Sequence, residues 1–465
     1  MWPSRSPKTV FRARRERLSR SLGDVSAVLA SGRPRARNYP ANTHPFRADS
    51  HFLYLVGRSI PEAALLLAEP EPKLYVLQPE PSAALWDGPT QSLEELGRDL
   101  GLRVRPLSEL GDWIRISGEE VATVPPNDDA TAAWLSSLLG RPIEARTGGA
   151  LADGTIDAAL ADALVELRLS HDAPGIAQLR QAAAATALAH RAGMRATRHG
   201  VHEADVAAAM MASLFASGMG MSYEPIVTVH GEVLHNRTYD NVIGIGDLLL
   251  ADVGAETPEG WAGDVTRVWP VKGRFSPTQK EVYQIVLDAQ RAAIALVRPG
   301  VRYRAIHEAA ARQILAGLVD LGILNGDVDG LAERGAHALF FPHGIGHLLG
   351  VDVHDMEDLG DRAGYERGRA RPPRFGDNYL RLDRDLRAGM AVTIEPGFYQ
   401  VPAILNDPEL TAPFEKDLDR SELARFGDVR GIRIEDDVLV TENGHDVLTS
   451  SIPKELQDIE TALGM

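Results

Sequence analysis

The chain has 465 residues, of which 44% are hydrophobic and 25% charged, and its formal net charge is −16. This length is too great for one ordinary hydrophobic core, so we expect two domains, and the acidic balance argues against nucleic acid as a partner. The absence of cysteine excludes disulfides, thiolate metal ligands and cysteine nucleophiles. No apolar run is long enough to span a membrane. We therefore expect a cytoplasmic protein without a membrane partner.

The first 22 residues are rich in arginine, in contrast to the rest of the chain. An arginine-rich, acid-poor start is compatible with a transit peptide. However, Phe11, Leu18 and Leu22 keep helical spacing, which favours a surface helix packed on the first domain. The apolar core of a secretion signal is missing from this stretch.

Residues 1–170 are expected to form a smaller domain in which helices and strands alternate. The segment 63–79 contains two strand-like runs around a proline-containing turn. Residues 92–101 and 130–140 are typical of helices that end at glycine. We find no catalytic constellation in this part of the sequence.

The domain boundary is placed near Ser170, within a stretch (153–200) that is helical almost throughout and is interrupted at Pro174 and Gly175. In the second domain, 171–465, alanine-rich helices alternate with strand runs that contain most of the acids and histidines of interest. The helices are predicted at 176–198, 203–217, 279–297 and 303–321.

Two aspartates flank a predicted hairpin within residues 246–271. The sequence 257–260 fits a type I turn, which would bring Asp252 and Asp264 almost opposite each other. Two acids in apolar surroundings repel and are costly to bury, so a divalent cation between them is expected. The alternative is a solvated edge hairpin whose aspartates have no special role, and the apolar flanks weaken it.

A second pair of acids lies on two predicted strands, 389–399 and 431–440. Glu395 and Glu435 each lie on the polar side of their strand. The alternative for Glu435 is a structural ion pair with Arg433. Four carboxylates and an imidazole suit two bridged divalent ions, whereas a mononuclear zinc hydrolase needs only three protein ligands. We expect Mn²⁺, with Co²⁺ and Zn²⁺ as alternatives.

Residues 342–355, PHGIGHLLGVDVHD, contain His343, His347 and His354. The first two are spaced like zinc ligands on a helix, but the segment lacks the glutamate of a His-Glu-x-x-His motif. It also contains glycines that each cost about 1 kcal/mol in a helix interior. We therefore predict a glycine loop that passes close to a ligand or metal and enters a strand over LLGVDVHD. His235 ends another strand run.

Together these residues resemble the M24 metallopeptidases with the pita-bread fold, and within them the proline-specific branch of prolidase and aminopeptidase P. The resemblance extends from about residue 170 to the end, through ADVGAE, GDVTR, HGIGHLLG, TIEPGFY and RIEDD. It implies an α/β (α+β) protein with a C-terminal pita-bread catalytic domain. The stretch PFRADSHFLYLVG, followed by LWDG, is similar to the family's smaller creatinase-like N-terminal domain. The metal ligands implied for two divalent ions are Asp252, Asp264, His347, Glu395 and Glu435.

The resemblance also implies roles for the remaining histidines. His235 would lie near the metal and contact the substrate. His343 and His354 would position the scissile carbonyl and shuttle protons, and Glu395 is our candidate general base.

Other residues are expected at the substrate. Tyr399 and Arg433 resemble groups that orient the site. Trp86 resembles the aromatic residue that reaches a neighbouring subunit's site, and the family implies a homodimer.

The segment 358–387, rich in Arg, Pro and Asp, is predicted to be a long irregular loop, and such loops are usually functional or disordered. Arg381 falls where prolidase-like enzymes place an arginine for the dipeptide's carboxylate, and a guanidinium can bind a carboxylate through two hydrogen bonds. The alternative is that Arg381 is one of several arginines on a solvated loop. We therefore favour an Xaa-Pro dipeptidase acting on dipeptides or short peptides. The alternatives are an Xaa-Pro aminopeptidase acting on longer peptides and a non-catalytic binding module of the same fold.

Overall fold

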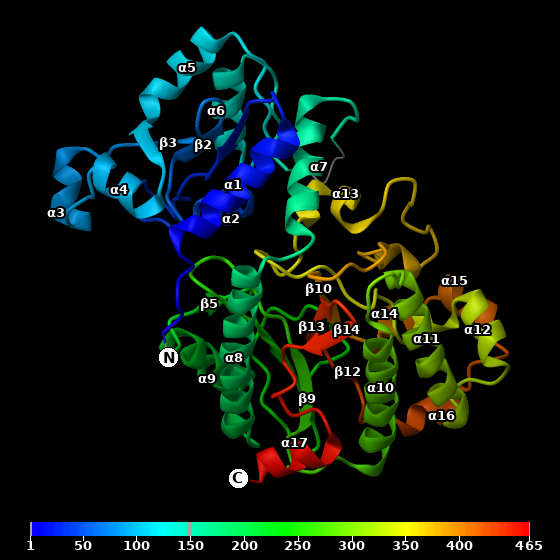
Figure 1. Ribbon diagram of the computed structural model, residues 1–465. Helices are drawn as coiled ribbons and strands as arrows, with labels where there is room; N and C mark the ends of the chain where they lie inside the picture. Colours follow the sequence, from blue (N-terminus) through cyan, green and yellow to red (C-terminus); the bar gives the residue numbers. More distant parts are fainter. Residues whose placement is uncertain (1, 147–150, 465) are drawn as a thin grey trace. The chain divides into compact units, whose positions relative to one another are not determined.

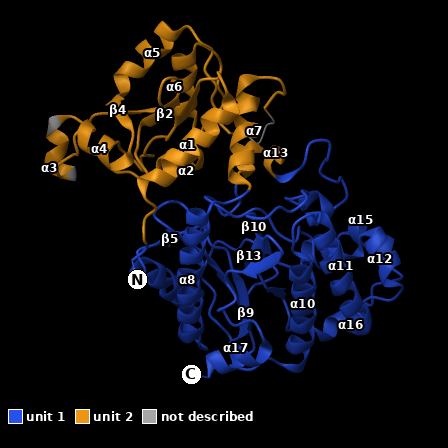
Figure 2. Ribbon diagram, in the orientation of Figure 1, with its two compact units in different colours: residues 1–3, 170–355, 364–465 blue, residues 4–169, 356–363 orange. Residues whose placement is uncertain are grey.

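The computed structural model describes residues 2–146 and 151–464 (Figure 1). The chain divides into two compact units, which Figure 2 shows in different colours. Unit 1 comprises Met1–Pro3, Ser170–Asp355 and Gly364–Met465, and unit 2 comprises Ser4–Leu169 and Met356–Ala363. The long segment predicted to be irregular therefore contributes its first residues to unit 2 and the rest to unit 1.

Unit 2 is built on a four-stranded sheet. Its strands, in spatial order, are β1 (Ala27–Ala30), β2 (Ala63–Leu67), β3 (Lys73–Val76) and β4 (Arg103–Pro106). β2 pairs antiparallel with both β1 and β3, whereas β4 lies parallel to β3. The two strands predicted within 63–79 are confirmed as β2 and β3.

The helices of unit 2 include the predicted N-terminal surface helix. They are α1 (Lys8–Leu22), α2 (Ser50–Val56), α3 (Ala84–Asp87), α4 (Leu93–Leu100), α5 (Leu110–Ser117), α6 (Asp129–Leu139) and α7 (Ile156–Arg168). α1 buries Phe11, Leu18 and Leu22, as predicted, and packs against α2 and α7. Arg14 and Arg15 are also buried, which was not predicted. Both guanidinium groups donate to carbonyls in the last turn of α2, at 3.2 and 2.7 Å, and so cap that helix.

The strands of unit 1 form several small sheets. They are β5 (Gly220–Met221), β6 (Ile226–Thr228), β7 (Leu248–Asp252), β8 (Ala255–Glu256), β9 (Thr266–Pro270), β10 (Ala391–Ile394), β11 (Gly397–Tyr399), β12 (Gly431–Arg433), β13 (Asp436–Thr441) and β14 (Gly444–Val447). Among the described residues the pairings are β6-β7-β9, β10-β13-β14, β11-β12 and β5-β8. β12 also packs against β7 and β9, so strands from both halves of unit 1 meet there.

Two helical hairpins accompany these strands. The helices are α8 (Ala173–Ala196), α9 (Glu203–Ala216), α10 (Pro277–Leu296), α11 (Tyr303–Asp320), α12 (Val328–Arg334), α14 (Pro402–Leu405), α15 (Pro408–Thr411), α16 (Arg420–Arg425) and α17 (Leu456–Leu463). α8 packs on α9 and α10 on α11, with the strands between α8 and α10 in Figure 1. All four alanine-rich helices predicted from the sequence are present. The helical stretch is interrupted between the end of α7 at Arg168 and the start of α8 at Ala173. Pro174 itself lies in the first turn of α8, where the Asp172 carboxylate accepts the Gly175 amide at 2.8 Å.

The strand predicted over residues 348–355 was wrong. Leu348 forms only an isolated bridge with Val392, and the chain then turns back, because the Asp355 amide donates to the Leu348 carbonyl at 3.0 Å. Leu348 and Leu349 are consecutive and both buried, so the apolar pattern comes from burial on two sides rather than from one strand face.

The long irregular loop predicted at 358–387 is confirmed. It contains only short helical turns: part of η4 (Glu357–Leu359), α13 (Asp361–Gly364) and η5 (Asp377–Tyr379). No helix among the described residues is both long enough and apolar enough to cross a membrane.

Candidate active site

A cavity of about 500 Å³ in unit 1 brings together most of the residues that the sequence singled out. Its lining includes Asp252, Asp264, His347, Glu395, Glu435, His235, His343, His354, Arg381 and Arg433. Tyr399 is fully buried and contacts two of these side chains. Trp86 is different, because it lies on α3 in unit 2 and is 82% exposed. Within this chain Trp86 is not part of the lining.

The two aspartates lie at adjoining ends of β7 and β9. Asp252 ends β7 opposite Thr266, and Asp264 lies two residues before Thr266. The predicted turn at 257–260 is present, with the Gly260 amide donating to the Thr257 carbonyl at 2.8 Å. The Tyr223 hydroxyl contacts both carboxylates, at 2.6 Å from Asp264 Oδ1. A hydroxyl with one proton can donate to only one of them, so the two carboxylates compete for it.

The two glutamates lie where paired strands change partners. β10 pairs with β13 up to Ile394 and Asp436, and β11 pairs with β12 from Gly397 and Arg433. Glu395 and Glu435 lie at the break between these two ladders, where neither residue belongs to a regular strand pairing. Each of the two predicted strands is therefore divided into two shorter ones, with the glutamate at the break.

Burial raises the pKa of the acids at this junction. The pKa of Glu395 rises to about 7, and that of Glu435 lies well above its usual range because of burial and the nearby charges of Asp264 and Glu395. The Thr266 hydroxyl donates to Glu435 Oε2 at 2.6 Å. Burial also raises the pKa of Asp264, and the charge of Asp252 adds to this effect. These carboxylates need a positive partner to stay ionised together.

His347 is oriented toward these acids by its backbone neighbours. Its Nδ1 donates to the Leu348 carbonyl at 3.0 Å, which leaves Nε2 facing Asp264 Oδ2 at 3.3 Å and Glu395 Oε1 at 3.6 Å. Burial opposes protonation, but the hydrogen bond with Asp264 and the charges of Glu395 and Asp264 outweigh it and raise the pKa of His347 to about 9. The preceding Gly346 lets this loop pass close to β10: an added Cβ would lie 2.2 Å from the Thr393 carbonyl oxygen.

These residues fit divalent cations. Asp264, His347 and Glu435 offer ligand atoms that all lie within 4.8 Å of one another. Oxygen donors with one imidazole suit Mn²⁺, Co²⁺ or Zn²⁺. A divalent cation would also relieve the repulsion that raises the carboxyl pKa values.

His343 belongs to a hydrogen-bonded relay. Its Nδ1 donates to the Gly344 carbonyl at 2.8 Å, so its Nε2 accepts from the Tyr399 hydroxyl at 2.9 Å. That hydroxyl in turn accepts from Arg433 Nη1 at 3.1 Å, and Arg433 Nη2 pairs with Asp252 Oδ2 at 2.5 Å. Burial and the Arg433 charge lower the pKa of His343 to about 3, so its imidazole is neutral.

The other two histidines also face the cavity in their neutral form. The His354 ring lies 4.4 Å from that of His347, centroid to centroid, and burial with the His347 charge lowers the pKa of His354 to about 2. Burial and the Arg433 charge lower the pKa of His235. Arg381 lines the same cavity, and its charge contributes to both shifts.

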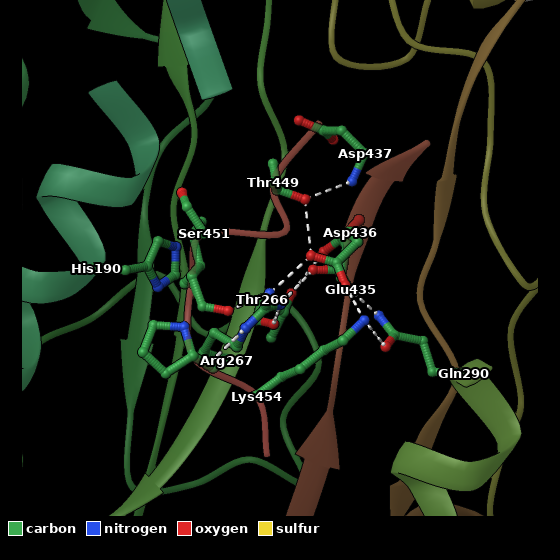
Figure 3. Close-up of polar contacts among 12 residues, drawn as sticks. His190, Thr266, Arg267, Gln290, Glu435, Asp436, Asp437, Thr449, Ser451 and Lys454 are labelled. Atoms are coloured by element: carbon green, nitrogen blue, oxygen red, sulfur yellow. Dashed lines mark hydrogen bonds and ion pairs between the residues drawn. The ribbon is translucent and has the colours of Figure 1, made fainter. Parts of the chain in front are cut away.

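A buried charge network behind Glu435 was missed by the sequence analysis (Figure 3). Asp436 Oδ1 accepts from Arg267 Nη2 and Thr449 Oγ1, both at 2.7 Å, while its Oδ2 accepts from Lys454 Nζ at 2.6 Å and Gln290 Nε2 at 3.0 Å. Because Arg267 Nη1 also donates to the Glu435 carbonyl at 2.5 Å, the network fixes the backbone of a predicted ligand. The only sequence signal was the run of three acids in RIEDD.

Tyr223 and Asp437 were missed for a different reason. Tyr223 lies in a loop after β5, 29 residues before Asp252, and nothing local marks it. The Asp437 carboxylate accepts the Asp264 amide at 3.2 Å, a contact between segments 173 residues apart. Contacts over such separations depend on the fold and not on local pattern.

Comparison with known proteins places this geometry in a family. The model of metallopeptidase family M24 matches residues 177–442, and that of the aminopeptidase P N-terminal domain matches residues 11–124. The chain belongs to metallopeptidase family M24. The predicted resemblance is thereby confirmed, as is the fold class, a pita-bread M24 domain with a smaller N-terminal domain.

Relatives of this M24 chain cover almost its whole length. It is 34% identical to a Xaa-Pro aminopeptidase of Haemophilus influenzae over 470 residues, covering 98% of this chain and 97% of the relative. The structure of Pseudomonas aeruginosa aminopeptidase PepP matches with a TM-score of 0.82 and 32% identity, covering 99% of this chain and 98% of the other. Aminopeptidase P of Escherichia coli with the inhibitor Pro-Leu matches with a TM-score of 0.79 and 29% identity, at 99% coverage of both. These names favour our alternative reading, the aminopeptidase, over the dipeptidase that we favoured.

Proposed function

We propose that the protein is a metal-dependent Xaa-Pro aminopeptidase, which removes the first residue from peptides whose second residue is proline. The observation that supports this most is the joint presence in one cavity of four carboxylates and His347, in a chain whose near-full-length relatives are named Xaa-Pro aminopeptidases. The Escherichia coli relative binds Pro-Leu, a peptide that begins with proline. Such a peptide has the form of the product released on the leaving side.

The five predicted ligands, Asp252, Asp264, His347, Glu395 and Glu435, would hold two divalent ions, for which we propose Mn²⁺ first. When bound, the ions supply Lewis acidity for the scissile carbonyl and lower the pKa of a bound water. The orientation of His347 suits this role, because its Nδ1 is engaged and its Nε2 faces the acids.

Proton transfer is assigned to this chain's own side chains. Glu395 lines the cavity beside the other predicted ligands, and we assign to it the acceptance of the proton of the attacking water. His354 and His235 face the cavity as neutral imidazoles and can each donate a hydrogen bond to the carbonyl oxygen or to the leaving nitrogen. His343 has both ring nitrogens engaged, so we assign it to positioning Tyr399 and Arg433.

Arg381 supports a second candidate, the dipeptidase. It lines the cavity, and a guanidinium there could bind the free carboxylate of an Xaa-Pro dipeptide. In an aminopeptidase the same group would contact the leaving peptide instead. The two functions differ in the length of substrate that is cleaved.

A single assay separates these candidates. The protein is dialysed against a chelator, reloaded with Mn²⁺, and incubated with Gly-Pro and with Gly-Pro-Leu. Release of glycine from the tripeptide supports the aminopeptidase, and cleavage of the dipeptide alone supports the dipeptidase. If neither peptide is cleaved while metal is bound, the fold serves as a binding module.

Metal content tests the ligand set. Glu435→Ala should lose bound Mn²⁺ and activity together, because Glu435 is one of the three groups whose ligand atoms converge. Full metal content and full activity in this variant would refute the two-ion site.

The subunit proposal rests on Trp86. We propose a homodimer in which this exposed tryptophan reaches the partner's cavity. Sedimentation of the wild type, and the KM of Trp86→Ala for Gly-Pro-Leu, test it: a monomer, or an unchanged KM, would refute the proposed role.

A further inference from the structure

A second cluster of metal-binding side chains lies in unit 1, outside the cavity just described. His307 on α11, His337 in η3 (Ala336–Leu339) and Asp377 in η5 offer ligand atoms that all lie within 4.8 Å of one another. Each of the three residues is at most 7% exposed. None of them is among the predicted ligands of the catalytic ions.

The two imidazoles have unusual surroundings. Among the residues that the structure describes, neither ring nitrogen of His307 nor of His337 has a hydrogen-bond partner. Leaving a buried polar group unpaired is unfavourable, and this pocket holds four such nitrogens. A cation bound to one nitrogen of each ring would satisfy two of them.

The third group is already oriented for such a role. Arg374 donates to Asp377 Oδ2 from Nε at 2.9 Å and from Nη2 at 2.7 Å. The other oxygen, Oδ1, therefore faces the imidazoles, at 3.6 Å from His337 Nε2 and 4.0 Å from His307 Nε2. These separations are too long for hydrogen bonds. They are close to the roughly 3.3 Å between ligand atoms around a tetrahedral zinc ion, given Zn–N and Zn–O bonds of about 2.0–2.2 Å.

From this arrangement we propose that His307, His337 and Asp377 form a further site for one divalent transition-metal ion, of which Zn²⁺ is the best fit. Two imidazoles with one carboxylate are a donor set that Zn²⁺ uses, with a fourth position left for water. The outer oxygen of the carboxylate is held by Arg374, as the outer atoms of metal ligands usually are.

A cation could reach the three side chains, and the charged residues around them do not oppose its binding. A cavity of about 190 Å³ adjoins the three side chains, and Glu308 and Glu333 also line it. Three arginines line it as well, but each pairs with a carboxylate: Arg304 with Glu308, Arg312 with Asp329 and Arg374 with Asp377.

The position of the site suggests what the ion would do. Asp377 belongs to the long loop, and its neighbours Phe375, Tyr379 and Arg381 all line the catalytic cavity. An ion shared with His307 would tie this part of the loop to α11. The proposed site is structural and does not depend on which peptides the enzyme cleaves.

Anomalous diffraction from crystals of the full chain grown with Zn²⁺ tests the proposal directly. We expect a peak at the zinc edge within bonding distance of His307, His337 and Asp377, besides any at the catalytic ligands, which act as an internal control. Peaks at the catalytic ligands with none at His307 and His337 would overturn the proposal. This result needs no variant and therefore does not depend on how a variant folds.

Metal stoichiometry gives an independent readout. After treatment with a chelator, reloading with Zn²⁺ and removal of excess metal, Asp377→Asn should hold about one ion per chain fewer than the wild type. The matched control is Asp383→Asn, which removes another buried, arginine-paired carboxylate from the same loop and should hold as many ions as the wild type. Equal zinc content in Asp377→Asn and the wild type would overturn the proposal.

Discussion

Replacing Asp436 with asparagine tests how much of the site's rigidity comes from the buried network behind Glu435. The Asp436 carboxylate is completely buried and accepts hydrogen bonds from Arg267, Thr449, Gln290 and Lys454. Asparagine keeps the shape of the side chain but removes its charge and turns one of the two oxygens into a donor. Thr449 and Gln290 can reorient, because a hydroxyl or an amide can donate or accept. Arg267 cannot, because it has donors only and is 0% exposed.

The expected loss follows from this geometry. Removing one partner of a buried ion pair costs about 3–5 kcal/mol, because the other charge stays buried without compensation. We expect a loss of stability in the lower part of this range, because Lys454 is 20% exposed and can turn toward water. Asp436→Asn should therefore lower the free energy of unfolding by about 3 kcal/mol.

The assay is urea denaturation of the metal-free protein, compared with the matched variant Asp446→Asn. Asp446 pairs with Arg180 at 2.5 Å, but both side chains are largely exposed, at 40% and 52%. An exposed pair contributes about 0–1 kcal/mol. A destabilisation of Asp436→Asn no greater than that of Asp446→Asn would refute the reasoning, because burial would then not decide the cost.

The pH dependence provides a second check on the same variant. Burial alone would raise the pKa of Asp436, but the charges of Arg267 and Lys454 dominate and hold it well below its usual range. A carboxyl with a lowered pKa stabilises the fold above the pKa of the unfolded chain, about 3.9, and loses that contribution as the pH falls toward its folded value. The stability difference between wild type and Asp436→Asn should thus be constant above about pH 5 and shrink below about pH 4.

Three further predictions concern the site itself. Tyr399→Phe removes the hydroxyl between Arg433 and His343. Because losing a hydrogen bond to a charged group costs about 1.5–3 kcal/mol, kcat should fall about tenfold to a hundredfold while the bound metal is unchanged. An unaltered kcat would contradict the relay. Metal binding at pH 7 should release a proton from His347, whose pKa without metal is about 9. The enthalpy of metal binding measured by calorimetry should therefore change with the ionisation enthalpy of the buffer, and a binding enthalpy independent of the buffer would contradict this. Gly346→Ala should reduce the metal content, because the added Cβ would lie 2.2 Å from the Thr393 carbonyl oxygen and push His347 away. The control is Gly444→Ala, whose added Cβ meets nothing within 4 Å, and this variant should bind metal normally.

The carboxylates and the histidine that line the cavity could be singled out because each lies in a local pattern, while their roles as metal ligands came from the resemblance to family M24 and stay a prediction. Asp252 ends an apolar strand, Glu395 and Glu435 follow alternating strands, and His347 follows glycines that exclude a helix. Most helices and strands could be predicted because they leave periodic apolar patterns, whereas the pita-bread fold followed from the resemblance to family M24. The strand expected over 348–355 was wrong because tertiary burial on two sides imitated that pattern.

The supporting residues could not be predicted in this way. Tyr223, Arg267 and Asp437 act through contacts with residues 29, 169 and 173 positions away, respectively. The cluster of His307, His337 and Asp377 likewise comes from three separate elements. The preference for a dipeptidase relied on Arg381, and the presence of a guanidinium in the cavity does not by itself set the length of the substrate.

The most direct test of the account is product analysis on a longer peptide. The protein loaded with Mn²⁺ is incubated with Gly-Pro-Leu-Ala and with a matched peptide in which alanine replaces proline, and the products are identified by mass spectrometry. The account predicts free glycine and Pro-Leu-Ala from the first peptide, no comparable cleavage of the second, and loss of the activity in Glu435→Ala. An intact proline peptide alongside cleaved Gly-Pro, or equal cleavage of both tetrapeptides, would contradict it.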